Sequence, residues 1–461
     1  MVEKMKQVFP LPDGTVYSRR KKFEPFSVPP LEAYMSFLSN WKAEKLLRII
    51  EKVKGIKVLE INATAKGGGV AEMLFSSIPF MNSIGVDTEW KTIHGTPEYY
   101  ECTKNIHNIM QGKKGVFTPE MAETYRCTLE ESSNVNLIDY EPNVVISHDP
   151  QPMGLAKHIK RPGQIWFWRC HIDIEGQTLD KNPGLFEFMR GWTHYYDAAI
   201  FSTAHYVAPG WAVPRFIIPP FIDPLSEKNR ELSQKEIDAV LAKYNIDSRI
   251  PIIAQIGRFD PWKGLDRTIA TYRLVRKERP CQLLLAGGIA SDDPEGVRIL
   301  NRILEETKND ENVHVLNLSL EDRIENWREV NALQRAATIL MQPSTREGFG
   351  LVITEALWKR KPVITANVGA IPLQVLGGVT GYFYRNAPNT ARKVLNLLDN
   401  PKEAAAMGES GRQYVKQHFL LPDRIADHLM AINLLVKGSI NKDVCSECII
   451  SFHPWFKVRK R

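Results

Sequence analysis

Short apolar runs alternate with helical patterns along this chain. The alternation stops at a proline-rich segment, residues 218–224, and then starts again. A run of this kind predicts a buried strand, and the helix that follows it returns the chain to the same edge of a parallel sheet. The strand candidates lie at 56–61, 83–87, 144–148, 164–168 and 198–201, and then at 252–256, 282–285, 314–316, 338–341 and 362–365. The sequence therefore predicts an α/β fold with two Rossmann-like domains.

The proline-rich segment divides the chain. We expect an N-terminal domain over 1–218, a hinge at 219–224 and a C-terminal domain over 225–414. A helix at about 415–437 is expected to pack back on the N-terminal domain. Residues 438–461 contain one pair of cysteines at CxxC spacing, without a second pair to complete a zinc site, and a basic end. We expect these residues to form a flexible tail.

Composition limits the class of protein. The chain has 461 residues, 43% of them apolar and 25% charged, which is enough for two hydrophobic cores. It shows neither an apolar stretch long enough to span a membrane nor a secretory signal, and its six scattered cysteines fit reduced thiols. A net charge of +7 suits a small polyanionic ligand and is too modest to indicate nucleic acid. We expect a cytoplasmic enzyme without membrane or nucleic-acid partners, and a homodimer is compatible with the sequence.

Two carboxylates mark the most informative site. Glu347 lies in a glycine-bearing turn after the strand candidate 338–341, and Glu355 follows eight residues later in a predicted helix. The first N–H groups of a helix have no partner inside the helix and can bind an anion. Acids beside such a site suit a ligand that carries both phosphate and hydroxyl groups, as a nucleotide sugar does.

Two cations occupy a similar place earlier in the same domain. Arg258 and Lys263 lie five residues apart, in a turn that follows the strand candidate 252–256. Ligands of doubly wound sheets bind at the carboxyl ends of the strands, where a guanidinium and an ammonium can clamp a diphosphate. Ordinary solvated loop cations are the alternative reading of this pair by itself.

Together, Arg258, Lys263 and the Glu347-x7-Glu355 spacing resemble the donor-site signature of glycosyltransferase family 4. Members of this family are retaining enzymes of the GT-B architecture, which has a ligand cleft between two Rossmann-like domains. The resemblance implies that Arg258 and Lys263 neutralise the diphosphate of a nucleotide sugar. It also implies that Glu347 holds the donor sugar hydroxyls and Glu355 the ribose hydroxyls. The turn is implied to bind the donor through Gly348, Phe349, Gly350 and Leu351. One departure is Leu373, where members often have an acid.

The N-terminal domain offers further candidates. A run of three glycines at 67–69 lets the backbone approach a ligand closely, and in the family this loop faces the donor. Gly68 and Gly69 are therefore donor-binding candidates, and Lys66 beside them is an acceptor-side candidate. Polar side chains also follow two strand candidates, where a cleft of an α/β protein binds ligands. The resemblance implies that His171 contacts the transferred sugar, and the acceptor-side candidates are His148, Asp149, Arg169 and Asp173. A structural role in the core is the alternative for the histidines.

Residues 147–152 and 166–173 further resemble the trehalose synthase branch of the family. That branch moves glucose from a nucleoside diphosphate to the anomeric hydroxyl of free glucose. The resemblance implies a retaining, front-face glucosyltransferase without metal or other cofactor, whose partners are NDP-glucose and glucose or trehalose. Its catalytic residues would be Arg258, Lys263, Glu347 and His171.

Two alternatives stay open on the same fold. One is a trehalose phosphorylase that uses glucose 1-phosphate, and the other is a regulatory protein that binds a sugar or nucleotide. A dinucleotide oxidoreductase is disfavoured because the chain lacks a GxGxxG motif with an acid about 20 residues further on.

Overall fold

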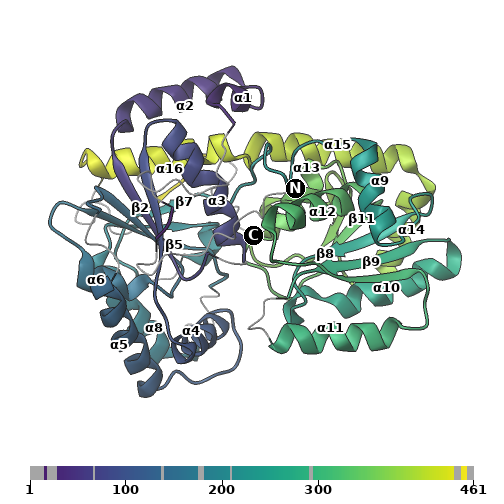
Figure 1. The fold of residues 1–461 in the computed structure, drawn as a ribbon, viewed down its shortest axis with the longest axis horizontal. Helices are drawn as coiled ribbons and strands as arrows, with labels where there is room; N and C mark the ends of the chain where they lie inside the picture. Colours follow the sequence, from purple (N-terminus) through teal and green to yellow (C-terminus); the bar gives the residue numbers. More distant parts are fainter. Residues whose placement is uncertain are drawn as a thin grey trace, which may run out of the picture. The chain divides into compact units, whose positions relative to one another are not determined.

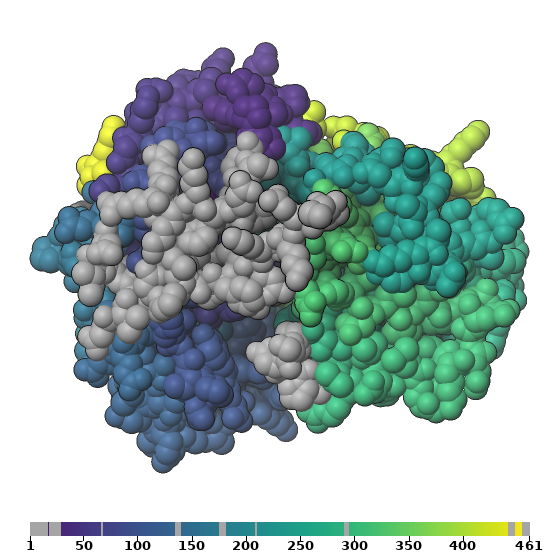
Figure 2. Space-filling view, viewed as in Figure 1, coloured from purple at the N-terminus to yellow at the C-terminus, as the bar shows by residue number. Residues whose placement is uncertain are grey.

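The structure is a computed structural model of the chain. It describes residues 15–17, 29–65, 68–135, 140–174, 181–207, 210–289, 294–440 and 448–453, which are coloured by sequence in Figure 2. The chain divides into two compact units. Unit 1 consists of Met1–Pro220 with Leu421–Arg461, and unit 2 is Phe221–Leu420.

Unit 1 contains a sheet of eight strands, in which β1 pairs antiparallel with β3 and all other neighbours are parallel. In spatial order the strands are β1 (Thr15–Tyr17), β3 (Asp87–Thr92), β2 (Lys57–Asn62), β4 (Val144–His148), β5 (Ile165–Cys170), β6 (Ala198–Phe201), β7 (Arg215–Ile217) and β14 (Ile449–Ile450). Its helices are α1 (Leu31–Met35), α2 (Asn40–Val53), α3 (Gly68–Ser83), α4 (Pro97–Met110), α5 (Pro119–Val135), α6 (Ala156–Ile159), α8 (Pro183–Trp192) and α16 (Leu421–Val436). The short turns η1 (Met153–Leu155), η2 (Thr193–Tyr195) and η3 (Ala204–Tyr206) connect them.

Unit 2 contains a sheet of six strands, all parallel. In spatial order these are β10 (Val313–Asn317), β9 (Gln282–Gly287), β8 (Ile252–Ile256), β11 (Ile339–Gln342), β12 (Val363–Thr365) and β13 (Gly381–Phe383). Its helices are α9 (Gln234–Lys243), α10 (Leu265–Glu278), α11 (Pro294–Thr307), α12 (Arg323–Ala336), α13 (Leu351–Trp358), α14 (Ala387–Asp399) and α15 (Pro401–His418). Two short turns, η4 (Pro261–Lys263) and η5 (Ile371–Leu373), complete it.

The core of unit 2 follows from the two-residue period of its strands. Ile253 of β8 packs in a cluster with Ile269 of α10, whereas its neighbour Ala254 packs in a second cluster with Leu333 of α12. Figure 1 accordingly shows β8 and β9 between α10 on one side and α12 on the other. Successive side chains of a strand point to opposite faces, so a strand covered on both faces is apolar throughout. This confirms the predicted α/β fold with two parallel sheets.

The C-terminal helix α16 belongs to unit 1, where it contacts α2 and α3. Lys42 of α2 lies 2.6 Å from Asp423 of α16, and Lys45 lies 2.7 Å from Asp427. The chain enters unit 2 after Pro220 and leaves it after Leu420. These two points are neighbours, because the N–H of Ile222 donates to the carbonyl of Phe419 at 2.9 Å.

Several details differ from the expectations, and the strands β7 and β13 were not predicted. The strand expected at 83–87 is wrong, because α3 runs to Ser83 and a turn with Gly85 at φ +87° precedes β3. Residues 448–453 are not a flexible tail, since β14 extends the sheet beside β7. Cys448 is disulfide-bonded and so is not a reduced thiol, whereas Cys102, Cys127, Cys170 and Cys281 are free. Among the helices of the described residues, none combines the length and the apolar character that a membrane span requires.

Candidate active site

In unit 2, the turns that follow β8 and β11 are distant in sequence but contact each other. Gly264 has φ +68°, and a Cβ atom there would lie only 2.3 Å from the carbonyl oxygen of Pro343. Only glycine adopts this conformation and allows this approach without strain. The N–H of Thr345 donates to the carbonyl of Trp262 at 2.7 Å. The turn that carries Lys263 is thereby held against the turn that carries Glu347.

Lys263 and Glu347 form an ion pair in this place. Lys263 Nζ lies 2.7 Å from Glu347 Oε2, and the two side chains are 18% and 11% exposed. Ser344 Oγ donates to the same carboxylate oxygen at 3.2 Å. The structure thus brings together two of the predicted residues. Arg258 is more open, since its side chain is 56% exposed and lies 3.7 Å from Asp260.

The turn between β11 and α13 has the form expected of an anion site. Gly350 is the N-cap of α13 and has φ +87°. The next residue, Leu351, begins the helix, whose first N–H groups can bind an anion. The side chain of Phe349 is buried against Phe419, with the ring centroids 5.6 Å apart, so Phe349 offers only its backbone. Gly348 lies in the partly exposed turn before it.

Glu355 is enclosed by protein groups. It is 1% exposed, its Oε1 lies 2.8 Å from Lys228 Nζ, and its Oε2 accepts from Gln334 at 2.8 Å. Burial by itself would raise the pKa of Glu355, but the charges of Lys228 and Lys359 outweigh this effect and lower the pKa to about 2. Lys228 was not predicted, because it follows the proline-rich segment in a stretch without strand or helix periodicity.

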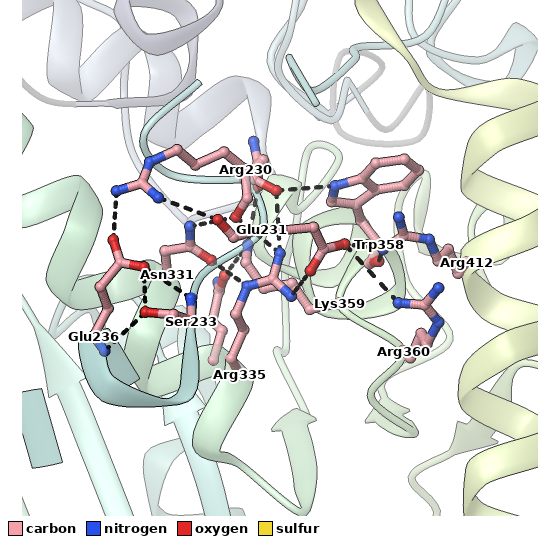
Figure 3. A network of polar contacts seen from close by, with 12 residues as sticks. Arg230, Glu231, Ser233, Glu236, Asn331, Arg335, Trp358, Lys359, Arg360 and Arg412 are labelled. Atoms are coloured by element: carbon pink, nitrogen blue, oxygen red, sulfur yellow. Dashed lines mark hydrogen bonds and ion pairs between the residues drawn. The ribbon is translucent and has the colours of Figure 1, made fainter. Parts of the chain in front are cut away.

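A network of arginines and glutamates holds the segment that carries Lys228 (Figure 3). The carboxylate of Glu231 accepts from Arg335 at 2.6 Å and from Arg412 at 2.8 Å. Trp358 Nε1 and Lys359 Nζ donate to the carbonyl and side-chain oxygens of Asn229, at 3.1 and 2.9 Å. The segment is therefore anchored to α12, α13 and α15, which fixes Lys228 beside Glu355.

In unit 1, the polar residues after β4 and β5 also come together. His148 Nδ1 lies 2.9 Å from His171 Nε2, and His148 Nε2 lies 2.6 Å from Oε2 of Glu60 on β2. Glu60 was not predicted. It lies inside an apolar strand run, and only the parallel pairing of β2 with β4 brings it beside His148.

Arg169 lies at the centre of this group and is 3% exposed. Its Nε donates to His171 Nε2 at 3.2 Å, and its Nη2 donates to the carbonyl of Ile218 at 3.2 Å. Its Nη1 donates to Nε2 of His428, a residue of α16 that was also not predicted, at 2.6 Å. Burial lowers the pKa of Arg169 to about 10, although the charges of Glu60 and Asp149 act in the opposite direction.

Asp149 holds the backbone of the same group. It has φ +63°, and its Oδ1 accepts from the N–H of His171 at 2.7 Å. Its carbonyl accepts from Trp168 Nε1 at 2.9 Å. Burial raises the pKa of Asp149 to about 6, despite the hydrogen bond from His171. Asp173 is buried as well, at 5% exposure.

The glycine-run candidates lie at the start of α3. Gly68 is its first residue, with φ +78°, and Gly69 follows in the first helical turn. Lys66 lies outside the described residues. Three or more metal-binding side chains do not cluster anywhere in the part of the chain that the structure describes.

Two family models match the chain. Residues 60–208 match the N-terminal domain of trehalose synthase, and residues 236–414 match the glycosyl transferases group 1. The chain is 40% identical over 409 residues to a trehalose synthase of Pyrococcus horikoshii, an alignment that covers 88% of this chain and 96% of the relative. It is 35% identical over 406 residues to that of Rubrobacter xylanophilus, covering 87% and 95%. A trehalose phosphorylase of Pleurotus pulmonarius is 27% identical over 414 residues, covering 79% of this chain and 55% of the relative.

Solved structures show the same fold at low sequence identity. An α,α-trehalose-phosphate synthase from Burkholderia xenovorans has a TM-score of 0.67 at 15% identity and covers 82% of this chain and 100% of its own. A sucrose-phosphate synthase from Thermosynechococcus elongatus has a TM-score of 0.65 at 16% identity and covers 84% and 100%. With two parallel sheets, both family models matched and relatives aligned over most of its length, the chain belongs to the GT-B glycosyltransferases, in the group of the trehalose synthases.

Proposed function

We propose that this protein is a retaining glucosyltransferase that forms trehalose from NDP-glucose and free glucose. The observation that carries the proposal is the ion pair of Lys263 and Glu347, 2.7 Å apart beside the first turn of α13. A cation, a carboxylate and a helix N-terminus at one place suit the diphosphate and the sugar hydroxyls of a nucleotide sugar. The relatives named trehalose synthase support glucose as the acceptor.

In this proposal the cationic side chains bind the leaving diphosphate. Lys263 and the exposed guanidinium of Arg258 neutralise the diphosphate, and the backbone from Gly348 to Leu351 binds its oxygens. Glu347 then accepts hydrogen bonds from hydroxyls of the transferred sugar. Because its carboxylate already accepts from Lys263, Ser344 and Gln342, its position is fixed before the sugar arrives.

The transfer breaks the bond between the anomeric carbon and the diphosphate oxygen and forms a bond from that carbon to the anomeric oxygen of the acceptor glucose. We propose that the acceptor approaches on the face from which the diphosphate leaves, and that the diphosphate takes up the acceptor proton. The sugar is briefly an oxocarbenium-like cation, and the configuration is retained. Catalysis then rests on stabilising the charge of the leaving group and on positioning the acceptor.

The expected contact between Glu355 and the ribose hydroxyls requires one rearrangement. Glu355 pairs with Lys228 and Gln334 and is 1% exposed. Ribose hydroxyls reach its carboxylate only if Lys228 turns away. We propose that Lys228 then turns to the diphosphate, whose charge replaces that of Glu355. No metal is required in this scheme, since Arg258, Lys263 and Lys228 supply the positive charge.

Phosphorolysis of trehalose is the second candidate, and the similarity to trehalose phosphorylases favours it. Inorganic phosphate would then bind at Lys263 and Arg258. That similarity covers 79% of this chain at 27% identity, against 88% at 40% for the trehalose synthase relative.

A product assay distinguishes these functions. The full-length protein is incubated with glucose and, in turn, ADP-, UDP- or GDP-glucose, and a parallel reaction contains glucose and glucose 1-phosphate. The disaccharide and its linkage are identified by NMR. We expect α,α-trehalose and free nucleoside diphosphate from at least one nucleotide sugar. Trehalose and phosphate from glucose 1-phosphate alone would establish a phosphorylase, and no product in any reaction would favour a regulatory binding protein.

A further inference from the structure

The donors of Arg169 determine the protonation of the histidines around it. An arginine side chain has only donors, so every atom that its N–H groups meet must accept. Nε2 of His171 lies 3.2 Å from Arg169 Nε, and Nε2 of His428 lies 2.6 Å from Arg169 Nη1. Both Nε2 atoms are therefore unprotonated, and both rings carry their proton on Nδ1.

The same reasoning extends to His148. Its Nδ1 lies 2.9 Å from Nε2 of His171, which is already an acceptor, so Nδ1 of His148 must donate. Its Nε2 lies 2.6 Å from Oε2 of Glu60, and a proton lies between these two atoms. Whether that proton belongs to the ring or to the carboxyl group, the pair has no net charge. The alternatives are costly: a proton on His148 Nε2 alone leaves two unprotonated nitrogens facing each other, and a proton on His171 Nε2 faces the N–H of Arg169.

We infer that Arg169 and the Glu60–His148 pair hold His171 in the form with a proton on Nδ1, so that the sugar contact expected of His171 is made by donation from Nδ1 to a hydroxyl oxygen. Within the described residues Nδ1 of His171 has no hydrogen-bond partner, and the residue is partly exposed. The N–H of His171 is bound to Asp149 Oδ1 at 2.7 Å, which fixes the backbone from which the ring projects. The sugar contact rests on the proposed function, and the position of the proton does not.

The surroundings also keep His171 neutral. The titratable and charged groups around it come from β4 with the residue after it, β5 and α16. They are His148, Asp149, Arg169 and His428, and Glu60 of β2 contacts His148 on its other side. Burial and the charge of Arg169 hold the pKa of His171 well below its ordinary value. The pKa of His428 is lowered by burial and by the same arginine. In this scheme His171 binds the sugar as a neutral donor, and Glu60, His148, Arg169 and His428 are positioning residues.

The first experiment determines directly which ring nitrogen of His171 carries the proton. The full chain is labelled with ¹⁵N-histidine, and protonated and unprotonated ring nitrogens are separated by NMR. The signals of His171 are those absent from both His171→Asn and His171→Gln. His158→Gln, on α6, should remove only its own signals and keep full activity. We expect a protonated Nδ1 and an unprotonated Nε2 for His171 near neutral pH, and a proton on Nε2 would overturn the inference whatever the activity.

The second experiment tests what the proton does. The amide nitrogen of asparagine takes a position close to Nδ1 of histidine, and that of glutamine a position close to Nε2. His171→Asn can therefore still donate to the sugar, and His171→Gln cannot. We expect His171→Gln to have kcat/KM lower than His171→Asn by about five- to tenfold, the effect of one neutral hydrogen bond. Equal or reversed values would overturn the sugar contact.

Glu60 offers a matched pair of variants. Glu60→Gln can donate to His148 Nε2, which leaves the His148 proton on Nδ1 and keeps the hydrogen bond from His148 to His171, whereas Glu60→Leu cannot. We expect the ¹⁵N spectrum of His148 to show a proton on Nδ1 in Glu60→Gln and a mixture of tautomers in Glu60→Leu, while Arg169 keeps Nε2 of His171 unprotonated in both. A single His148 tautomer with its proton on Nδ1 in a folded Glu60→Leu protein would remove Glu60 from the inference. If the labelled protein shows the expected tautomer but no nucleotide sugar is a substrate, the proposed function fails while the proton assignment holds.

Discussion

Replacing Lys263 by methionine should strongly reduce turnover with little effect on folding. Lys263 Nζ lies 2.7 Å from Glu347, and the proposal places this ammonium at the leaving diphosphate. Removing one donor that stabilises developing charge costs ~10²–10³ in kcat, which is about 3–4 kcal/mol of transition-state stabilisation.

The effect on stability should be much smaller. Glu347 keeps hydrogen bonds from Ser344 at 3.2 Å and Gln342 at 3.5 Å when Lys263 is gone. A partly exposed ion pair contributes about 1 kcal/mol or less to the free energy of unfolding. In a domain of this size that corresponds to a change in Tm of about 2–4 °C.

The assay measures initial rates of nucleoside diphosphate release at saturating NDP-glucose and glucose, together with Tm by scanning fluorimetry. The matched control is Lys243→Met, which breaks contacts of Lys243 with Glu325 and Glu329 elsewhere in unit 2 and should keep wild-type kcat. Near-wild-type turnover in a folded Lys263→Met protein would refute the assignment of Lys263 to the leaving group.

Three further predictions concern the same site. Arg258→Ala should lower kcat by ~10²–10³ without changing Tm, since Arg258 is 56% exposed and 3.7 Å from Asp260; an unchanged kcat would contradict its role. Glu355 has a pKa lowered from 4.5 to about 2, so its ionised form stabilises the fold above about pH 5 and this contribution is lost as the pH falls towards 2. Glu355→Gln should therefore be less stable than wild type in urea at neutral pH, by a margin that shrinks at about pH 3 and below, whereas a constant margin would argue against the ionised pair with Lys228. Prolonged treatment with EDTA should leave initial rates unchanged, and activity that is lost and then restored by Mg²⁺ would show that a metal is needed.

The fold was predictable because its signal is local. Apolar strand runs and intervening helical patterns can be read within a few residues, and a restart after the prolines marks a second domain. The strand prediction was wrong at β3, where polar side chains are buried. β3 reads Asp-Thr-Glu-Trp-Lys-Thr, and Thr88, Glu89 and Lys91 are buried although the sequence resembles an exposed segment. Contacts with the rest of unit 1 bury this strand, and no local pattern reports them.

The residues of the candidate site could also be predicted only in part. Lys263 and Glu347 could be predicted because glycine turns after apolar strands mark the edge of a parallel sheet where ligands bind. Glu60 and His428 could not, because they lie within a strand and a helix that have no distinctive motif. The enclosure of Glu355 by Lys228 depends on a segment without periodicity, held by the arginine network of Figure 3.

The sequence by itself determined most of the strand and helix order, the glycine turns and the set of charged side chains at the strand ends, because these depend on neighbours in the chain. The tertiary structure alone decided which distant groups meet. The register that places Glu60 opposite Ile146 and His148 opposite Arg169 is a property of the assembled sheet. The burial, hydrogen-bond direction and pKa of a side chain follow from these contacts, since each depends on the groups that surround the side chain in space.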